Sequence, residues 1–181
     1  MAGKWLEMLT QLTPPATNIA VLHNPATTPY ANSMMGTIDE AAKSLGVSVR
    51  AVPVADEAGI DAAMKELGTE QRRGVLVLPS AFTVRYRDAI VASAARHRVP
   101  AVYPFREFAT SGGLMFYGVN HPELFRHSAS YIDRILKGAK PADLPVQAPT
   151  KFELIFNLKA AAALGVTIAP SALGTADQVI E

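Results

Sequence analysis

Short apolar runs recur along this chain, and each is followed by a stretch with the periodicity of an amphipathic helix. The clearest run is residues 74–78, Gly-Val-Leu-Val-Leu, which Pro79 closes. Continuous β-branched and leucine-rich runs of this length are typical of strands that are covered on both faces. Strands are predicted at residues 18–23, 47–54, 74–78, 100–103 and 114–117. The regular alternation of strand and helix predicts an α/β fold, a doubly wound, mostly parallel sheet flanked by helices.

The predicted helices carry boundary signals. Pro29 suits the first turn of a helix, and Tyr30, Met34 and Ile38 then recur on one face of it. Gly46 ends the same pattern, as a left-handed cap does. Helices are predicted at residues 4–12, 29–45, 57–67 and about 84–97.

The regular alternation of strand and helix ends after Gly118. His121-Pro122 opens a predicted helix to about Lys137, and a proline-rich connector follows at residues 138–149. Alternating apolar residues predict one more strand near residues 152–156, and short helices are predicted at 158–164 and after Pro170. The chain therefore divides into residues 1–118, residues 119–149 and residues 150–181.

Composition excludes several classes of protein. The chain has 181 residues, of which 49% are hydrophobic and 18% charged, so it can bury a core. Its formal net charge of +1 comes from scattered basic residues, which argues against a nucleic-acid partner. It has no cysteine and no apolar run of the roughly eighteen residues that a membrane span needs. The start of the chain shows no signal peptide, so a cytoplasmic location is expected if the chain is complete.

Candidate ligand-binding residues lie where the predicted strands end. The carboxyl ends of parallel strands form the edge at which open α/β sheets bind ligands. Hydroxyl, amide and aromatic side chains collect there, and this mixture suits a small-molecule pocket better than a catalytic centre. The alternative is that the polar residues are turn formers and that Tyr103 and Phe105 belong to the core. The candidates are Asn24, Thr27, Thr28, Tyr30, Ser80, Ala81, Phe82, Tyr103, Phe105 and Tyr117.

Signals of catalysis are weak. The four histidines have no metal-ligand spacing, and no glycine-rich phosphate loop or nucleophile elbow is present. Arg106 and Glu107 are adjacent, and adjacent side chains do not face one another. We therefore expect no enzyme activity, no catalytic residue, no metal and no cofactor.

Several spaced motifs together resemble one family. They are Pro100-Ala-Val-Tyr-Pro-Phe-Arg-Glu-Phe108, Gly112-Gly-Leu-Met-Phe-Tyr-Gly118, Ile135-Leu-Lys-Gly-Ala-Lys-Pro-Ala-Asp-Leu-Pro145, Pro149-Thr-Lys-Phe-Glu-Leu-Ile-Phe-Asn-Leu-Lys159 and Ala163-Leu-Gly-Val-Thr-Ile168. In this order they closely resemble the substrate-binding proteins of ABC transporters that include the tryptophan and tyrosine types. Gly3-Lys4-Trp5-Leu6-Glu7 also resembles the segment that joins the two lobes in that family.

The resemblance implies a type I periplasmic-binding-protein fold, in which a solute is trapped between two lobes joined by a hinge. It implies that residues 1–118 are a Rossmann-like ligand-binding lobe opened by an interlobe helix. Residues 119–149 would be a crossover helix with its connector, and residues 150–181 would complete the lobe. The implied function is the solute-binding component, here the second lobe only, of an ABC-type import system for a small molecule such as an amino acid or an aromatic compound.

The resemblance also implies partners, a location and roles for the site. An ABC permease would be the partner, and the location would be periplasmic. The loops at the helix starts would recognise a carboxylate or amide, while Phe82, Phe105 and Tyr117 would stack on a ring. The helix after Pro122 would lack its usual partner lobe, so we expect its apolar face to be covered in a homodimer.

Two alternatives stay open at this level. One is a flavodoxin-like enzyme or regulatory domain that binds a nucleotide or a phosphorylated ligand at the same sheet edge, although the glycine-rich loop is missing. The other is a truncated gene product that keeps the fold and has lost transport.

Overall fold

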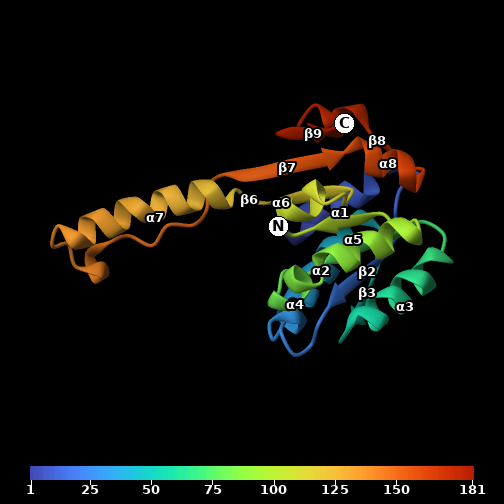
Figure 1. Ribbon diagram of the computed structural model, residues 1–181, viewed down its shortest axis with the longest axis horizontal. Coiled ribbons are helices and arrows are strands. Elements are labelled where there is room, and N and C mark those ends of the chain that lie inside the picture. Colours follow the sequence, from blue (N-terminus) through green and yellow to red (C-terminus); the bar gives the residue numbers. More distant parts are fainter.

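The computed structural model describes the backbone of residues 1–181 and every side chain but that of Ala2 (Figure 1). The strands are β1 (Leu12–Thr13), β2 (Asn18–His23), β3 (Ser48–Pro53), β4 (Arg73–Val77), β5 (Ala101–Tyr103), β6 (Met115–Val119), β7 (Phe152–Asn157), β8 (Thr167–Ile168) and β9 (Gln178–Ile180). The helices are α1 (Ala2–Thr10), α2 (Ala31–Leu45), α3 (Glu57–Gly68), α4 (Ala81–Arg85), α5 (Arg87–Arg96), α6 (Arg106–Thr110), α7 (His121–Leu136), α8 (Leu158–Leu164) and α9 (Pro170–Leu173), with a 3-10 turn, η1 (Pro141–Asp143).

A seven-stranded sheet in the order β3-β2-β4-β5-β6-β7-β9 confirms the predicted α/β class. Strands β3, β2, β4, β5 and β6 pair in parallel in this order. Val21 of β2 therefore lies between Ala51 of β3 and Leu76 of β4. The pairing of β6 with β7 is antiparallel, so the sheet is mostly rather than wholly parallel. A separate two-stranded pairing joins β1 to β8.

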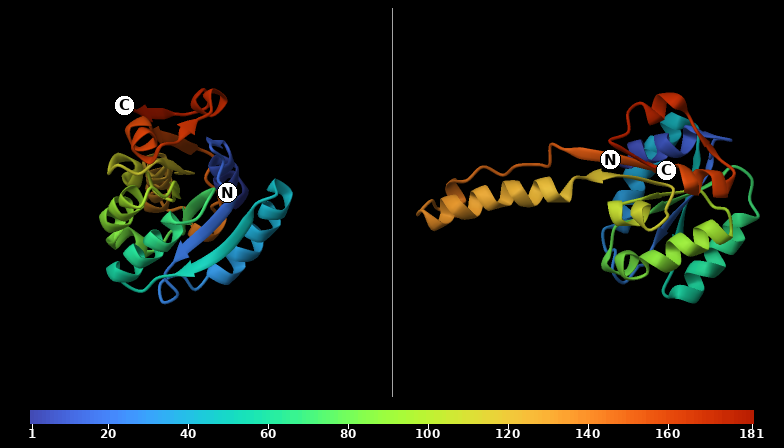
Figure 2. Two further views of the ribbon diagram at one scale, coloured as in Figure 1. Left: turned by 90° about the vertical axis from the view of Figure 1, so that its right-hand side faces the viewer. Right: turned by 45° about the horizontal axis from the view of Figure 1, so that its top comes forward.

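Helices cover both faces of the sheet (Figure 2). Ile19 and Val21 of β2 pack with α1, α2, α8 and α9 on one face. Ala20 and Leu22 pack with α3, α4, α5 and α6 on the other face. This follows from the strand geometry, since successive side chains point to opposite faces. Strand β2 is therefore covered by helices on both of its faces, as its continuous apolar run predicts.

Residues 120–151 form an arm that leaves the α/β body between β6 and β7 (Figures 1 and 2). It consists of α7, η1 and a return segment that runs back along α7. Asn120 caps α7 by accepting a hydrogen bond of 3.0 Å from the Glu123 N–H, and Pro122 occupies the first turn. The Tyr131 hydroxyl holds the return segment by donating to the Pro145 carbonyl at 2.7 Å. None of the residues of α7 is buried.

Several predicted boundaries were wrong. The helix expected at 84–97 is two helices, α4 and α5, and the first of them begins at Ala81 because Ser80 caps it. The helix expected at 29–45 begins at Ala31, and the first helix ends at Thr10 so that Leu12 joins β1. The short elements β1, α6, β8 and β9 were not expected from the sequence.

Candidate functional site

The loop after β2 is braced by its own side chains. The Asn24 amide nitrogen donates to the Val54 carbonyl at 2.8 Å. The Asn24 amide oxygen accepts from the backbone N–H and the hydroxyl of Thr27 at 3.0 and 3.1 Å. Asn24 is buried and Thr27 is exposed. These two candidates therefore fix the shape of the loop, and Thr27 also faces solvent.

The start of α2 lies free at the end of this loop. Its capping residue is Tyr30, whose side chain makes no capping hydrogen bond. The Tyr30 hydroxyl instead donates to the Pro79 carbonyl, which joins the loop after β2 to the loop after β4. Burial raises the pKa of Tyr30, so the hydroxyl keeps its proton for this bond. The Ala31 N–H donates to the Thr28 carbonyl at 3.0 Å, so the N–H groups of Asn32 and Ser33 are the ones left for an anion or a carboxylate.

Two polar atoms close in sequence to this helix start are buried and have no hydrogen-bond partner among the described residues, His23 Nδ1 and Thr28 Oγ1. His23 ends β2 in the same alternation as Ile19 and Val21, which places it on the face of α1 and α2. Burial lowers the pKa of His23, so the ring is neutral near pH 7. Unpaired buried polar groups are uncommon, and each of these two atoms keeps unused hydrogen-bonding capacity. His23 was not among the predicted residues, although a histidine at the end of an apolar strand is a recognisable signal.

The loop after β4 is used for helix capping. The Ser80 hydroxyl accepts from the Thr83 N–H at 3.1 Å, and the Thr83 hydroxyl accepts from the Ser80 N–H at 3.0 Å. Ala81 is exposed as the first residue of α4. Phe82 is buried, with its ring centroid 4.7 Å from that of Tyr86. Ser80 therefore serves as a helix cap, and the ring of Phe82 belongs to the core.

The aromatic candidates do not form one wall. Tyr103 is 2% exposed and stacks on Phe108 at 5.0 Å between ring centroids, so its ring lies in the core, as the alternative interpretation of the sequence had it. Phe105 is half-buried and meets the ring of His121 at 5.6 Å. Tyr117 is half-buried on the opposite face of the sheet, stacked at 5.8 Å on Phe152. Phe105 and Tyr117 therefore flank the root of the arm from its two sides.

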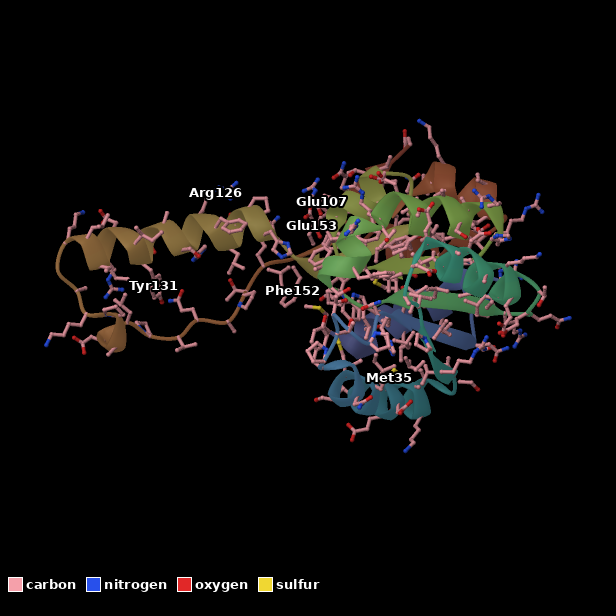
Figure 3. The ribbon with its side chains drawn as sticks, turned by 60° about the horizontal axis from the view of Figure 1, so that its bottom comes forward. Met35, Glu107, Arg126, Tyr131, Phe152 and Glu153 are labelled. Carbon is pink, nitrogen blue, oxygen red and sulfur yellow. The ribbon has the colours of Figure 1, made fainter. Side chains whose placement is uncertain are left out.

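An ion pair at the root of the arm was missed from the sequence. Arg106 donates to Glu153 at 2.9 Å and to the Gln178 side chain at 3.0 Å. Glu153 is 8% exposed, and its second carboxylate oxygen has no partner among the described residues. Phe152 and Glu153 lie where the arm leaves the body (Figure 3). An acidic residue inside an otherwise apolar strand was the available signal.

Among the described residues, no group of three or more His, Asp or Glu side chains gathers as a metal site. Within the same residues, no helix is long and apolar enough to cross a membrane. The strand ends offer a free helix start, unpaired buried polar atoms and two half-buried rings, which are groups that hold a small polar molecule.

Comparisons with known proteins agree with this description. A family model described as ABC transporter substrate binding protein matches residues 1–180. None of the curated proteins matches the chain. A solved structure of an ABC domain in complex with L-Trp from Streptococcus pneumonia is similar with a TM-score of 0.85 at 24% identity, covering 99% of this chain and 60% of that one.

Two further solved structures share the fold. A conserved domain protein from Vibrio cholerae has a TM-score of 0.84 at 21% identity. The match covers 98% of this chain and 60% of that chain. The ligand-free, open structure of CD0873, a substrate binding protein with adhesive properties from Clostridium difficile, has a TM-score of 0.70 at 19% identity, with 98% and 59% covered. The chain thus spans about 60% of the length of these solved chains.

Proposed function

The chain belongs to the ABC transporter substrate binding protein family, a family of binding proteins rather than enzymes, and we propose that it is the carboxy-terminal lobe of a solute receptor that serves an ABC-type import system. In this proposal, residues 1–118 and 150–181 make the lobe, and residues 119–149 are the crossover. Two observations support the division. The arm contributes no residue of α7 to the buried core, and the solved chains of similar fold are longer than this one.

The observation that carries the proposed site is the uncapped start of α2 beside two unpaired buried polar atoms. The bond from Tyr30 to Pro79 fixes this start against the neighbouring loop. Thr28 Oγ1 and His23 Nδ1 lack partners, and a bound carboxylate or amide is a group that would supply one. We therefore assign the polar end of the solute to the start of α2, near Thr28 and His23.

The proposed solute is an amino acid or a related aromatic compound. Phe105 and Tyr117 are half-buried on opposite faces of the sheet, so either ring has surface left to contact a planar group. The similar structure from Streptococcus pneumonia holds L-Trp, which has both a carboxylate and a ring. We further propose an extracytoplasmic location and an ABC permease as the partner, both of which rest on membership of the family.

Binding by this chain should be weak, because one lobe supplies only part of the contacts and no closure. The test is calorimetric titration, with thermal shift beside it, using L-tryptophan, L-tyrosine, other aromatic acids and nucleotides. We expect the amino acids or aromatic acids to bind and raise the melting temperature. Stabilisation by nucleotides alone would contradict the proposal and favour the flavodoxin-like alternative.

A variant pair localises the site. Thr28→Val keeps the shape of a buried side chain and removes its hydroxyl, so we expect affinity to fall roughly tenfold, the value of about one hydrogen bond. Thr69→Val changes a threonine at the far end of α3, where the hydroxyl bonds to Glu66, and should leave binding unchanged. Equal losses of affinity in the two variants would show that the start of α2 is not the binding site.

A further inference from the structure

A small cavity lies between α5 and α8, on the side of the body away from the arm (Figure 1). Its volume is about 80 Å³. Leu114, which lines the cavity, precedes β6, whereas the arm leaves the body at the other end of that strand, after Val119. The cavity is therefore separate from the start of α2, where the polar end of the solute is placed, and from the root of the arm.

Small residues make the space in this cavity. Alanines of α5 and α8 and two successive glycines line it: Ala94, Ala95, Ala160, Ala163, Gly112 and Gly113. Ala95 and Ala163 are exposed, so the cavity opens to solvent between the two helices. Val91 and Leu114 are buried and form its inner end. A solvent-accessible mouth thus leads to an apolar interior.

Tyr103 is the one lining residue whose side chain can form a hydrogen bond. A Cβ at Gly113 would stand 2.5 Å from a ring carbon of Tyr103, so the ring lies directly against the glycine wall. The residue is 2% exposed, and its hydroxyl makes no hydrogen bond to the described residues. Buried tyrosine hydroxyls usually have a partner. Burial raises the pKa of Tyr103, so the hydroxyl keeps its proton and is a free donor.

Water fits this cavity badly. A buried water usually makes about three hydrogen bonds, whereas a single side-chain donor lines this cavity. The volume exceeds the roughly 30 Å³ of one water and is smaller than the roughly 150 Å³ of an apolar cavity that takes up benzene. The space therefore suits a molecule of a few heavy atoms that is apolar except for one hydrogen-bond acceptor.

We propose that this cavity is a binding site for a short-chain alcohol. The alcohol oxygen accepts a hydrogen bond from the Tyr103 hydroxyl, and the alkyl chain lies against Val91 and Leu114. The alcohol proton is directed to the mouth between Ala95 and Ala163, where solvent accepts it, so no polar group stays unpaired. Charged compounds are excluded, because no side chain of opposite charge lines the cavity. This site stands independently of the proposed function.

Titration of the 181-residue chain with 1-propanol, followed by amide signals in nuclear magnetic resonance, is the first test. We expect the signals of Gly112 and Gly113 to shift and to saturate. The dissociation constant should be millimolar, because so small a ligand makes few contacts. Shifts that grow linearly without saturation, or that are equally large at the start of α2, would overturn the proposal.

Tyr103→Phe tests the hydrogen bond. The variant keeps the ring that stacks on Phe108 and removes only the hydroxyl. We expect the affinity for 1-propanol to fall roughly tenfold, the value of about one hydrogen bond. An unchanged affinity would overturn the role of Tyr103 and the ligand class with it. Saturable shifts with xenon but not with 1-propanol would likewise show an apolar cavity that is no alcohol site.

A pair of alanine variants tests the location. Ala95→Leu fills the mouth of the cavity, so saturable binding should be lost. Ala92→Leu is the matched control, because Ala92 is also exposed on α5 but does not line the cavity. It should bind 1-propanol with unchanged affinity. Equal binding by the two variants would show that the alcohol binds elsewhere and would overturn the proposal.

Discussion

The indole nitrogen of Trp5 donates a hydrogen bond of 2.7 Å to the backbone carbonyl of Tyr117. Trp5 is 2% exposed in α1, and Tyr117 lies in β6, the strand that leads into the arm. The first helix of the chain is therefore joined to the root of the arm by this hydrogen bond.

Trp5→Phe should lower the free energy of unfolding by about 1–3 kcal/mol, because the Tyr117 carbonyl loses its partner and part of the ring volume is lost. Urea denaturation followed by circular dichroism measures this change. Lys4→Ala on the same helix is the control, and a surface change of that kind should stay within about 0.5 kcal/mol. An unchanged unfolding free energy in Trp5→Phe would show that the bond contributes nothing.

Gly113→Ala should destabilise the chain by about 1–3 kcal/mol through overpacking. A Cβ there would stand 2.5 Å from a ring carbon of Tyr103 and 2.7 Å from the Phe108 carbonyl oxygen, and both belong to the packed core. Gly36→Ala is the opposite case, since a Cβ at Gly36 within α2 meets nothing within 4 Å. Helix propensity should make that variant more stable by about 0.5–1 kcal/mol. Melting temperatures that move in opposite directions are the expected result.

Arg106→Met should destabilise the body by roughly 1–3 kcal/mol, because it leaves the Glu153 carboxylate buried without its cation. Arg106→Met combined with Glu153→Leu should cost less than Arg106→Met alone, since no buried charge then remains. Chemical denaturation of the single and double variants measures the two free energies of unfolding. A double variant less stable than the single one would mean that Glu153 has favourable contacts besides Arg106.

The thermal stability should fall as the solution becomes acidic, in part because of His23. Burial lowers the pKa of His23 below its ordinary value of 6.5, so the unfolded chain takes up this proton more readily than the folded chain. Above pH 6.5 both states are neutral and His23 contributes no penalty. As the pH falls below that value, the unfolded state is favoured until the folded ring is protonated as well.

Melting curves from about pH 8 to about pH 5 measure this dependence. His23→Gln should flatten it, since a glutamine side chain takes up no proton in this pH range. Identical slopes in the unaltered chain and His23→Gln would contradict the assignment.

Local rules accounted for most of the fold. The apolar run at residues 74–78 and the capping signal of Gly46 were sufficient to place β4 and the end of α2, where Gly46 adopts a left-handed φ of 65°. The short elements β8, β9 and α6 were beyond these rules, because two to five residues carry no measurable periodicity. The positions of β8 and β9 are set by pairing with strands far away in the sequence, β8 with β1 and β9 with β7.

The candidate site was predicted at the level of loops and less well at the level of side chains. The strand-end rule locates Tyr30 and Phe105, but it does not say which way a ring turns, and Phe82 and Tyr103 turn into the core. The unpaired atoms of His23 and Thr28 depend on three-dimensional packing, which no sequence pattern reports.

Antiparallel pairing of β6 and β7 brings Val119 opposite Phe152, and Asn120 N–H donates to the Lys151 carbonyl at 3.1 Å. Two strands in this register can be joined by a turn of two residues. The whole arm is thus an insertion at the tip of a β-hairpin, and none of its described residues belongs to the buried clusters of the body. Replacing residues 121–150 by Asn-Gly, which keeps the hydrogen-bonded pair of Asn120 and Lys151 as the closing pair of the turn, should therefore leave the α/β body folded without the arm.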